Sequence, residues 1–295
     1  MIKYSIVLPT YNRSRLLRKS LEALAVQTAT KEVYEIIIVN DGAKDNTKDI
    51  VNSFSKNNPD LVLEYIEQNN SGPAKARNVG IKRSRGEIIF FTDDDCVVPP
   101  NWIEKLADGY ARYPKIAGAG GRYEWDNSSK IFAKYYEQKI NKKYEKLNKD
   151  NEINNNTFLK NPAGNTSNMS YKKTVLEEVG GFDENINFPG FDDTDLKKRI
   201  MERYSILYIP ISVTHIRPMG LFHIMKRLFN FGRGRRHFVN KHKDLYSFYN
   251  PSYKKMRQRI RHVSQNRTLF SIYTIFDFIF TRLGWEYQKL TEKNA

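Results

Sequence analysis

Three carboxylates stand side by side at Asp93, Asp94 and Asp95, one residue after a run of four apolar residues, 88–91. Like charges this close raise one another's pKa unless a cation, hydrogen bonds or solvent offsets the cost. If the strand continued, residues 93 and 95 would point to one side, because side chains alternate along a strand. Two carboxylates on one side would suit Mg²⁺ or Mn²⁺. The alternative is a solvated acidic turn.

A second acidic pair, Asp192 and Asp193, opens a helix that the sequence predicts from Phe191 to about Tyr204. An acidic residue at a helix start needs no function, because it caps backbone N–H groups and complements the helix dipole. A carboxylate at a helix start near a pocket could also serve as a general base. The local sequence leaves both interpretations open.

Basic residues and one histidine add further candidates. Lys75 and Arg77 lie at the start of a predicted helix, where backbone N–H groups favour phosphate binding, although a solvated basic face fits equally well. The five histidines show no paired metal spacing. His215 alone follows a predicted strand, where it is either structural or a metal ligand.

Strand and helix signals alternate over the first hundred residues, and they must position these side chains. Strands are predicted at 4–8, 35–39, 61–66 and 88–91, and helices at 13–27, after Gly42 and at 74–82. This alternation predicts parallel βαβ units and a doubly wound α/β sheet. Ligands of such sheets bind beyond the carboxyl ends of the strands. Residues 9–12, 40–42 and 93–95, which follow three of the strands, should therefore gather at one rim.

Beyond residue 114 the pattern is looser. A strand is predicted at 165–171, and the asparagine-rich stretch 148–156 is predicted to be a loop. No run of 18 apolar residues occurs, so we expect no membrane span. The N-terminal apolar stretch is too short for a signal peptide, and the single cysteine, Cys96, fits a reducing compartment. We therefore expect a cytoplasmic protein.

The net charge of +16 is confined to the last third of the chain. Residues 1–196 hold 28 basic and 28 acidic residues, whereas residues 197–295 hold 21 basic and 5 acidic residues. This basic part also carries the apolar stretch 269–280, which is too short to span a bilayer. It could bind an anionic membrane surface, pack on the rest of the protein or bind nucleic acid. No nucleic-acid motif is present, so we expect no nucleic-acid partner.

Six segments occur in the order and spacing seen in family 2 glycosyltransferases, which the chain resembles over about residues 3–216. The segments are Val7–Arg13, Ile38–Gly42, Ala76–Gly80, Gly86–Asp95, Gly180–Glu184 and Asp192–Leu196. The resemblance implies a GT-A type α/β fold, with a doubly wound mixed sheet and helices on both faces. It places the catalytic domain at 1–216, with nucleotide-sugar binding in about 1–115 and acceptor binding in about 116–216. A basic, aromatic-rich helical extension, 217–295, would follow.

The resemblance also implies an activity, in which a sugar moves with inversion from a nucleotide sugar to a hydroxyl of a glycan or lipid-linked acceptor. UDP is the most frequent nucleotide, and Mn²⁺ or Mg²⁺ the cofactor. Polysaccharide synthesis, on the inner face of a membrane, is the expected setting. The sequence also leaves open a sugar nucleotidyltransferase, or a catalytically inactive membrane- or nucleic-acid-binding protein.

Residue roles follow from the same resemblance. Asp93 and Asp95 match the Asp-x-Asp motif, with Asp95 the direct metal ligand and His215 a further candidate ligand. Asp193 stands where the family places its base, but the Glu that commonly precedes it is Asp192 here, so the choice between the two stays open. We expect Asp94 to point elsewhere and to tolerate substitution better. The donor-site candidates are Pro9, Tyr11, Arg13, Asp41 at the base, Lys75, Arg77, Asp93 and Asp94.

Overall fold

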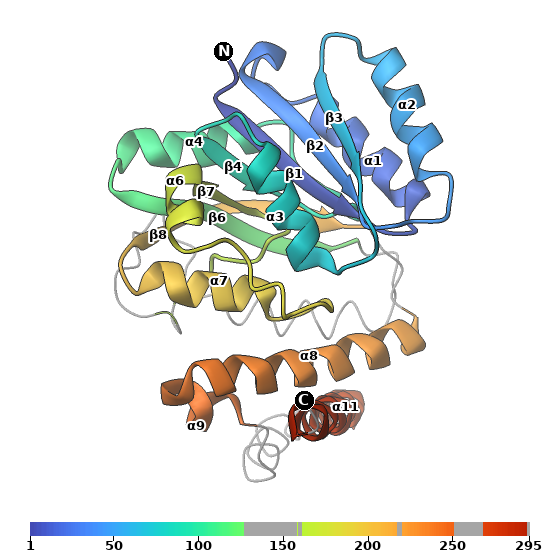
Figure 1. Ribbon diagram of the computed structural model, residues 1–295, viewed down its shortest axis with the longest axis vertical. Coiled ribbons are helices and arrows are strands. Elements are labelled where there is room, and N and C mark those ends of the chain that lie inside the picture. Colours follow the sequence, from blue (N-terminus) through green and yellow to red (C-terminus); the bar gives the residue numbers. More distant parts are fainter. Residues whose placement is uncertain (127–157, 159–160, 217–219, 251–267, 294–295) are drawn as a thin grey trace.

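The computed structural model describes residues 1–126, 158, 161–216, 220–250 and 268–293, and for 268–273 only the backbone. In these residues one eight-stranded mixed sheet forms the centre of the molecule, in the order β3-β2-β1-β4-β7-β6-β8-β5 (Figure 1). The strands are β1 (Tyr4–Thr10), β2 (Tyr34–Asn40), β3 (Val62–Glu67), β4 (Ile88–Phe91), β5 (Cys96–Val97), β6 (Ile116–Trp125), β7 (Met169–Lys172) and β8 (Ser205–His215).

Helices cover both faces of this sheet, and two long helices follow it (Figure 1). The α-helices are α1 (Ser14–Ala25), α2 (Thr47–Asn57), α3 (Pro73–Arg83), α4 (Trp102–Arg112), α6 (Lys173–Glu178), α7 (Asp192–Met201), α8 (Leu221–Lys241), α9 (Tyr246–Tyr249) and α11 (Thr268–Lys293), with 3₁₀ turns η1 (Lys31–Val33) and η3 (Lys243–Leu245). The α/β class and every helix and strand predicted in the first hundred residues are confirmed.

The sheet is parallel in its first half and mixed in its second. Strands β3, β2, β1 and β4 are parallel neighbours, as the βαβ pattern predicts. Strand β7 runs antiparallel to both β4 and β6, and β5 runs antiparallel to β8. The sheet is therefore the mixed GT-A type that the resemblance implies.

The predicted strand at 165–171 is shorter in the structure and begins only at Met169. The side chain of Asn165 accepts hydrogen bonds from the backbone N–H and the hydroxyl of Ser167, at 2.9 and 2.7 Å. Its carbonyl also accepts the N–H of Asn168 at 3.0 Å. Asparagine side chains stabilise such turns locally, and the turn replaces the first half of the strand. The predicted loop at 148–156 lies outside the described residues.

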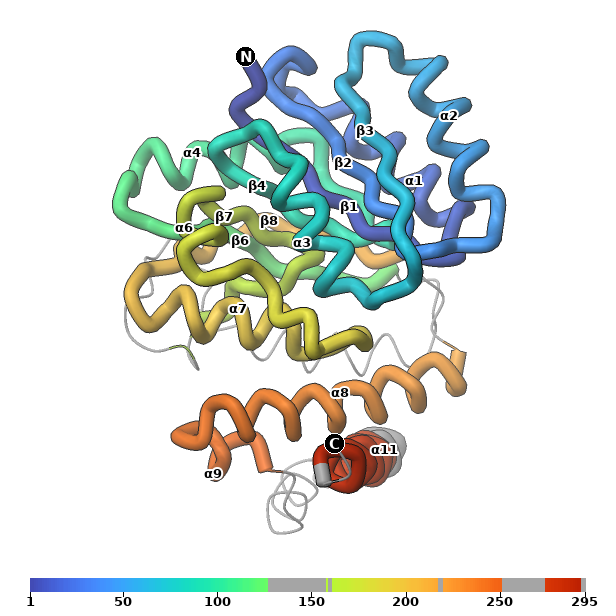
Figure 2. The backbone as a smooth tube through the Cα atoms, viewed as in Figure 1, coloured from blue at the N-terminus to red at the C-terminus, as the bar shows by residue number. Residues whose placement is uncertain are grey.

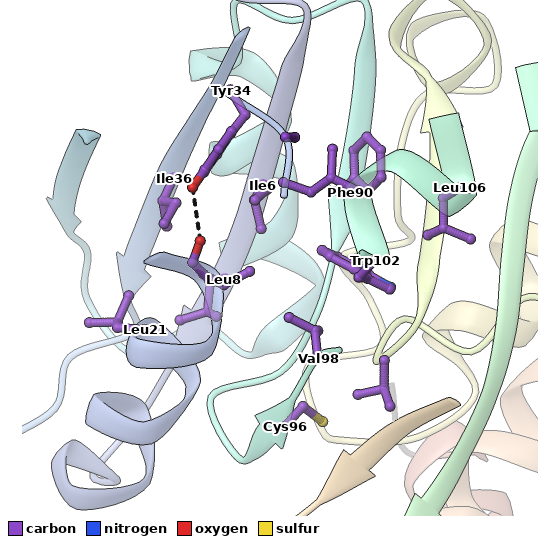
Figure 3. Close-up of a cluster of buried hydrophobic side chains, with 14 of the residues drawn as sticks. Ile6, Leu8, Leu21, Tyr34, Ile36, Phe90, Cys96, Val98, Trp102 and Leu106 are labelled. Atoms are coloured by element: carbon purple, nitrogen blue, oxygen red, sulfur yellow. Dashed lines mark hydrogen bonds between the residues drawn. The ribbon is translucent and has the colours of Figure 1, made fainter. Parts of the chain in front are cut away.

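Two apolar cores lie on opposite faces of the sheet, because successive residues of the buried strands point to opposite sides. In β1, Ile6 and Leu8 join the core under α1 and α4, whereas Val7 joins the core under α3, α6 and α7. Figure 3 shows part of the first core, including Phe90 and Trp102, whose rings meet edge to face at 5.3 Å. These cores hold the strand ends at the rim in fixed positions.

The two long C-terminal helices lie together at one side of the sheet. In Figure 2, α7 lies between the sheet and α8, and α11 lies beyond α8. Within the described residues, no helix is both long and apolar enough to cross a membrane. The division at residue 216 stays a prediction; β8 ends at His215 and α8 begins at Leu221, on either side of it.

Candidate active site

The acidic run after β4 forms a turn, not a continued strand. Strand β4 ends at Phe91, and the N–H of Cys96 donates to the carbonyl of Asp93 at 3.1 Å. Residues 93 and 95 are therefore not part of a strand, and the prediction that strand alternation points them to the same side was wrong. The turn nevertheless places the carboxylates at the carboxyl ends of β1 and β4, which is the predicted rim.

A group of possible metal ligands forms where this turn meets the end of β8. Strand β5 pairs with β8 so that Cys96 lies opposite His215, and single ligand atoms of Asp93, Cys96 and His215 all lie within 4.8 Å of one another. The Oδ1 atom of Asp95 is 3.2 Å from Nδ1 of His215. The predicted candidates Asp93, Asp95 and His215 are thus brought together from two distant segments of the chain.

Cys96 is the member of this group that sequence reasoning missed. Its Sγ lies 3.2 Å from Nδ1 of His215, and the side chain is buried at the edge of the first core (Figure 3). Burial, with the Asp95 and Asp93 carboxylates nearby, holds the pKa of its thiol well above the usual range. Carboxylate oxygens suit both Mn²⁺ and Mg²⁺, an imidazole nitrogen suits Mn²⁺ better than the harder Mg²⁺, and a thiol is a soft ligand. The two carboxylates therefore fit the implied ion, the imidazole favours Mn²⁺ over Mg²⁺, and the thiol is the part that does not fit.

Arg13 neutralises the other side of the acidic turn. Its Nη1 donates to Asp94 at 2.8 Å and to Asp95 at 3.2 Å, and Thr10 also donates to Asp94 at 2.8 Å. Asp94 is only 2% exposed, and that it points away from the metal candidates stays a prediction. Burial raises the pKa of Asp94 to about 6, although Arg13 opposes the rise. A buried, ion-paired carboxylate is costly to remove, so the expectation that Asp94 tolerates substitution is not supported by its surroundings.

Arg77 connects the two acidic segments that the sequence separates by almost a hundred residues. It is buried, and it donates from Nη1 to Asp192 at 2.6 Å and from Nη2 to Asp93 at 2.9 Å. The ring of Phe182 lies 5.6 Å from its guanidinium carbon. The forked guanidinium can bridge two carboxylates, whereas an ammonium group is a single point charge. Arg77 is therefore the structural link between the start of α7 and the turn after β4.

The surroundings distinguish Asp193 from Asp192. The Asp192 carboxylate is buried and ion-paired with Arg77, whereas Asp193 is partly exposed and accepts a hydrogen bond from the neighbouring Thr194 at 3.1 Å. Burial and the Asp192 charge raise the pKa of Asp193 to about 6, against the opposing effect of Arg77. A general base works best with a pKa near the working pH, so the geometry favours Asp193.

Asp41 lies at the rim, at the end of β2, and organises the loop that follows β3. Its carboxylate accepts hydrogen bonds from Gln68 Nε2 at 2.7 Å, from the Ser71 N–H at 2.8 Å and from the Gly72 N–H at 2.9 Å. Gly72, with φ +94°, leads directly into α3 and hence to Arg77. Asp41 therefore holds this loop in place, and its contact with a nucleotide base stays a prediction.

The remaining donor-site candidates differ in their surroundings. Pro9 is buried within β1, and Tyr11, just after that strand, is 47% exposed at the rim. Lys75 is exposed on α3 and makes no ion pair with any described residue. Pro9 and Tyr11 flank Thr10, which donates to Asp94, so their place at the donor stays a prediction, and among the described residues Lys75 has no ion-pair partner there.

Aromatic residues and a cation from α8 close the other side of His215. The Trp125 ring stacks on His215 at a centroid distance of 4.7 Å, and Tyr123 meets the same imidazole edge to face at 5.2 Å. The guanidinium carbon of Arg227, from α8, lies 5.2 Å from the Trp125 ring centroid. The basic C-terminal part therefore contributes directly to the wall of the site. The only sequence signal for this wall was the charge asymmetry.

A GT-A type sheet with an acidic, arginine-braced rim is typical of glycosyltransferases. The sequence matches the family model described as Glycosyl transferase family 2 over residues 5–180, more than half of the chain. The protein therefore belongs to glycosyl transferase family 2. Membership favours this activity over the nucleotidyltransferase and the inactive binding protein that the sequence had left open.

Curated relatives are glycosyltransferases. Glycosyltransferase AglE of Haloferax volcanii is 28% identical over 234 residues, which cover 78% of this chain and 72% of AglE. Poly(ribitol-phosphate) beta-N-acetylglucosaminyltransferase TarS of Staphylococcus aureus is 37% identical over 107 residues, 36% of this chain and 18% of TarS. The match thus spans less than a fifth of TarS.

Solved structures support the fold. A mannosyltransferase of Pyrobaculum calidifontis, PcManGT, in complex with GDP-Man and Mn²⁺, has a TM-score of 0.69 at 16% identity, covering 97% of this chain and 88% of its own. Residues 1–349 of S. aureus TarS in complex with UDP have a TM-score of 0.59 at 17% identity, covering 98% and 92%. At these identities the likeness establishes the GT-A fold and not the substrate.

Proposed function

We propose that the protein is an inverting glycosyltransferase that moves a sugar from a nucleotide sugar, most often a UDP-sugar, to a hydroxyl group of a glycan or lipid-linked acceptor. The single observation that carries the proposal is the Arg77 bridge between Asp93 and Asp192. Asp193, the candidate base, directly follows Asp192, which Arg77 connects to Asp93 on the proposed donor and metal side. Enzymes gain much of their rate by holding reacting groups in such fixed geometry.

The proposed chemistry divides between the two acidic segments. Asp193 takes the proton of the acceptor hydroxyl as that oxygen attacks the anomeric carbon from the side opposite the diphosphate. One displacement inverts the configuration. Pro9, Tyr11, Arg13, Asp41 and Arg77 belong to the nucleotide-sugar side, and Arg13 and Arg77 balance its acidic residues.

Asp93, Asp95 and His215 would hold Mn²⁺ or Mg²⁺. A divalent ion there supplies Lewis-acid stabilisation of the charge that develops on the leaving diphosphate. PcManGT, solved in complex with GDP-Man and Mn²⁺, and TarS, solved in complexes with UDP and with UDP-GlcNAc, support both parts of this proposal. We test the donor by thermal shift with UDP- and GDP-sugars, with and without Mn²⁺. Binding stabilises the folded state, so a cognate donor raises the unfolding midpoint.

Metal dependence gives a direct prediction. EDTA should abolish transfer and Mn²⁺ should restore it, and His215→Ala should weaken Mn²⁺ binding about tenfold to a hundredfold, as expected for loss of a ligand or its support. Mn²⁺ binding is measured by isothermal titration calorimetry in the presence of UDP, independently of turnover. His223→Ala, at an exposed position of α8, is the matched control. Unchanged Mn²⁺ affinity in His215→Ala would remove His215 from the proposed site.

The exposed face of α11 is the basis for a proposal about where the enzyme acts and which acceptor it uses. Five apolar residues spaced three or four apart form one stripe of this helix and are 40–62% exposed: Ile275, Ile279, Leu283, Tyr287 and Leu290. Thr281 and Trp285, on the opposite side, are buried. Directly before α11, residues 251–267 hold six basic and no acidic residues. An apolar helix stripe that a basic segment precedes in the sequence suits an anionic membrane surface.

We propose this peripheral contact as the means by which the enzyme reaches a membrane-bound acceptor at the inner face. The net charge of +16 opposes pairing of two copies and favours anionic lipid. The relatives of the chain include a glucosyl-dolichyl phosphate glucuronosyltransferase of Haloferax volcanii, which supports a lipid-linked acceptor here. The same contact would suit work on cell-surface polysaccharides.

Vesicle flotation tests the contact. The full chain should float with vesicles of phosphatidylcholine and phosphatidylglycerol and not with phosphatidylcholine alone, and Ile279→Glu with Leu283→Glu should abolish flotation. Val26→Glu, at an apolar position of the catalytic part that is 63% exposed, is the control. Absence of flotation with the vesicles that contain phosphatidylglycerol would refute the contact. A dimer that the α11 variant dissociates, measured by light scattering, would assign the stripe to a second copy instead.

A further inference from the structure

The turn that precedes Asp192 and Asp193 has an unusual backbone. Gly190 has φ +130°, and Phe191, the N-cap residue of α7, has φ +70° and ψ −5°. Bulky side chains disfavour this left-handed region, so such a conformation persists only where surrounding contacts enforce it. Because Asp192 follows directly, the turn determines the direction from which both aspartates leave the backbone.

The contacts that surround Phe191 come from the C-terminal helices. Its side chain is buried, and its ring lies 5.7 Å from the rings of Phe231 and Phe238 and 5.6 Å from that of Tyr249. Phe231 and Phe238 belong to α8, and Tyr249 to α9. Three aromatic rings from outside residues 1–216 therefore surround the ring of Phe191, the N-cap residue of α7.

The backbone of α8 also touches the turn. A Cβ atom at Gly234 would lie 2.7 Å from the carbonyl oxygen of Gly190 and 2.8 Å from Cβ of Phe191, both closer than real Cβ contacts allow. Glycine at position 234 is thus required by the close approach of the two segments. On the other side of α8, Cβ atoms at Gly232 and Gly284 would run into backbone carbonyls of α11 and α8, so α11 supports α8 equally closely.

Charged groups fix the next part of α7. Asp195 is fully buried, and its carboxylate accepts hydrogen bonds from Arg199 at 2.8 Å, from Lys241 at 3.1 Å and from His242 Nε2 at 2.9 Å. Lys241 also reaches Asp183 at 2.8 Å. Lys241 and His242 lie at the end of α8, so α8 contacts α7 both at its N-cap residue, Phe191, and one turn further along, at Asp195.

We infer that α8, supported by α11, is a clamp that positions the proposed base, and that Phe191, Gly234 and His242 are its positioning residues. The inference rests on the proposed role of Asp193, and it gives the C-terminal helices a part in the reaction separate from any membrane contact. Errors of about 1 Å in such a geometry can cost about a hundredfold in rate.

Gly234→Ala tests the clamp with the smallest possible change. Alanine is the better helix former, so a loss of activity cannot arise from helix propensity. We expect kcat to fall about a hundredfold, as for a misplaced reacting group, and any rise in the donor KM through the Asp192–Arg77 pair to be the smaller effect. Phe222→Ala, on the same helix but 72% exposed, is the control and should keep wild-type kcat. Wild-type kcat in Gly234→Ala would overturn the inference.

A double-mutant cycle separates this inference from the proposed function. If the clamp acts through Asp193, Gly234→Ala should add little to the loss caused by Asp193→Asn. Multiplying losses would overturn the clamp while leaving Asp193 as base. Wild-type turnover in Asp193→Asn alone would instead refute the base. Should Gly234→Ala not fold by circular dichroism, the same cycle is run with His242→Ala, and His242→Gln, which can still donate to Asp195, should restore most of kcat.

Discussion

Asp193→Asn is expected to lower kcat by about 10²- to 10⁴-fold, the usual contribution of a positioned general base. The amide has nearly the same shape but cannot take a proton. Donor binding should be retained, because the Arg77 bridge runs to Asp192 and Asp93 and not to Asp193. The measurements are initial rates of transfer and a thermal shift with the donor. Wild-type turnover in this variant would show that the base lies elsewhere.

The pH profile gives the same prediction a second, independent form. A base must be deprotonated to act, and burial together with Asp192 raises the pKa of Asp193 to about 6. The rate should therefore be constant above this value and fall about tenfold for each pH unit below it. This fall in rate below about pH 6 should be absent from the residual activity of Asp193→Asn. Asp192→Asn serves as comparison: it should disturb donor binding as well, because Asp192 is paired with Arg77.

Much of this site could be predicted because several of its residues directly follow strands. A buried parallel strand is recognised in the sequence by a run of apolar residues, and the residues that follow such strands lie at the same rim of the sheet. That rule places Asp41 and the acidic run at 93–95 at the rim from the sequence alone. The rule says nothing about how the chain continues past the strand. Here the chain turns at Asp93, so the alternation of side chains along a strand does not apply to residues 93 and 95.

The remaining features depend on pairings between distant segments. Cys96 joins the metal candidates only because β5 is antiparallel to β8 in one particular register. The sequence around Arg77 does not indicate either of its partners, because a solvated basic face explains an arginine on a helix equally well. The contact of α8 with the turn at Phe191 depends on how a helix outside the sheet packs. Composition revealed only that this part of the chain is basic and aromatic.

Removing the Arg77 side chain should affect stability and activity together. In Arg77→Ala the carboxylates of Asp93 and Asp192 lose their shared cation while Asp192 stays buried. Loss of one partner of a buried ion pair costs about 3–5 kcal/mol, because the other charge remains without compensation. Chemical denaturation of the full chain measures this loss. Arg83→Ala, on the same helix, is the matched control, since the Arg83 pair with Glu64 is exposed and such pairs contribute about 0–1 kcal/mol.

The same variant should also move the pH profile, and this separates an electrostatic role from a purely structural one. Arg77 lowers the pKa of Asp193, so its removal should shift the acidic limb of the rate to higher pH. Arg77→Lys keeps the charge but cannot bridge two carboxylates at fixed geometry, so it should restore part of the pKa effect without restoring donor affinity. If Arg77→Ala left both the free energy of unfolding and the limb near pH 6 unchanged, the two acidic segments would act independently. Arg77 would then have no role in joining the base to the donor side.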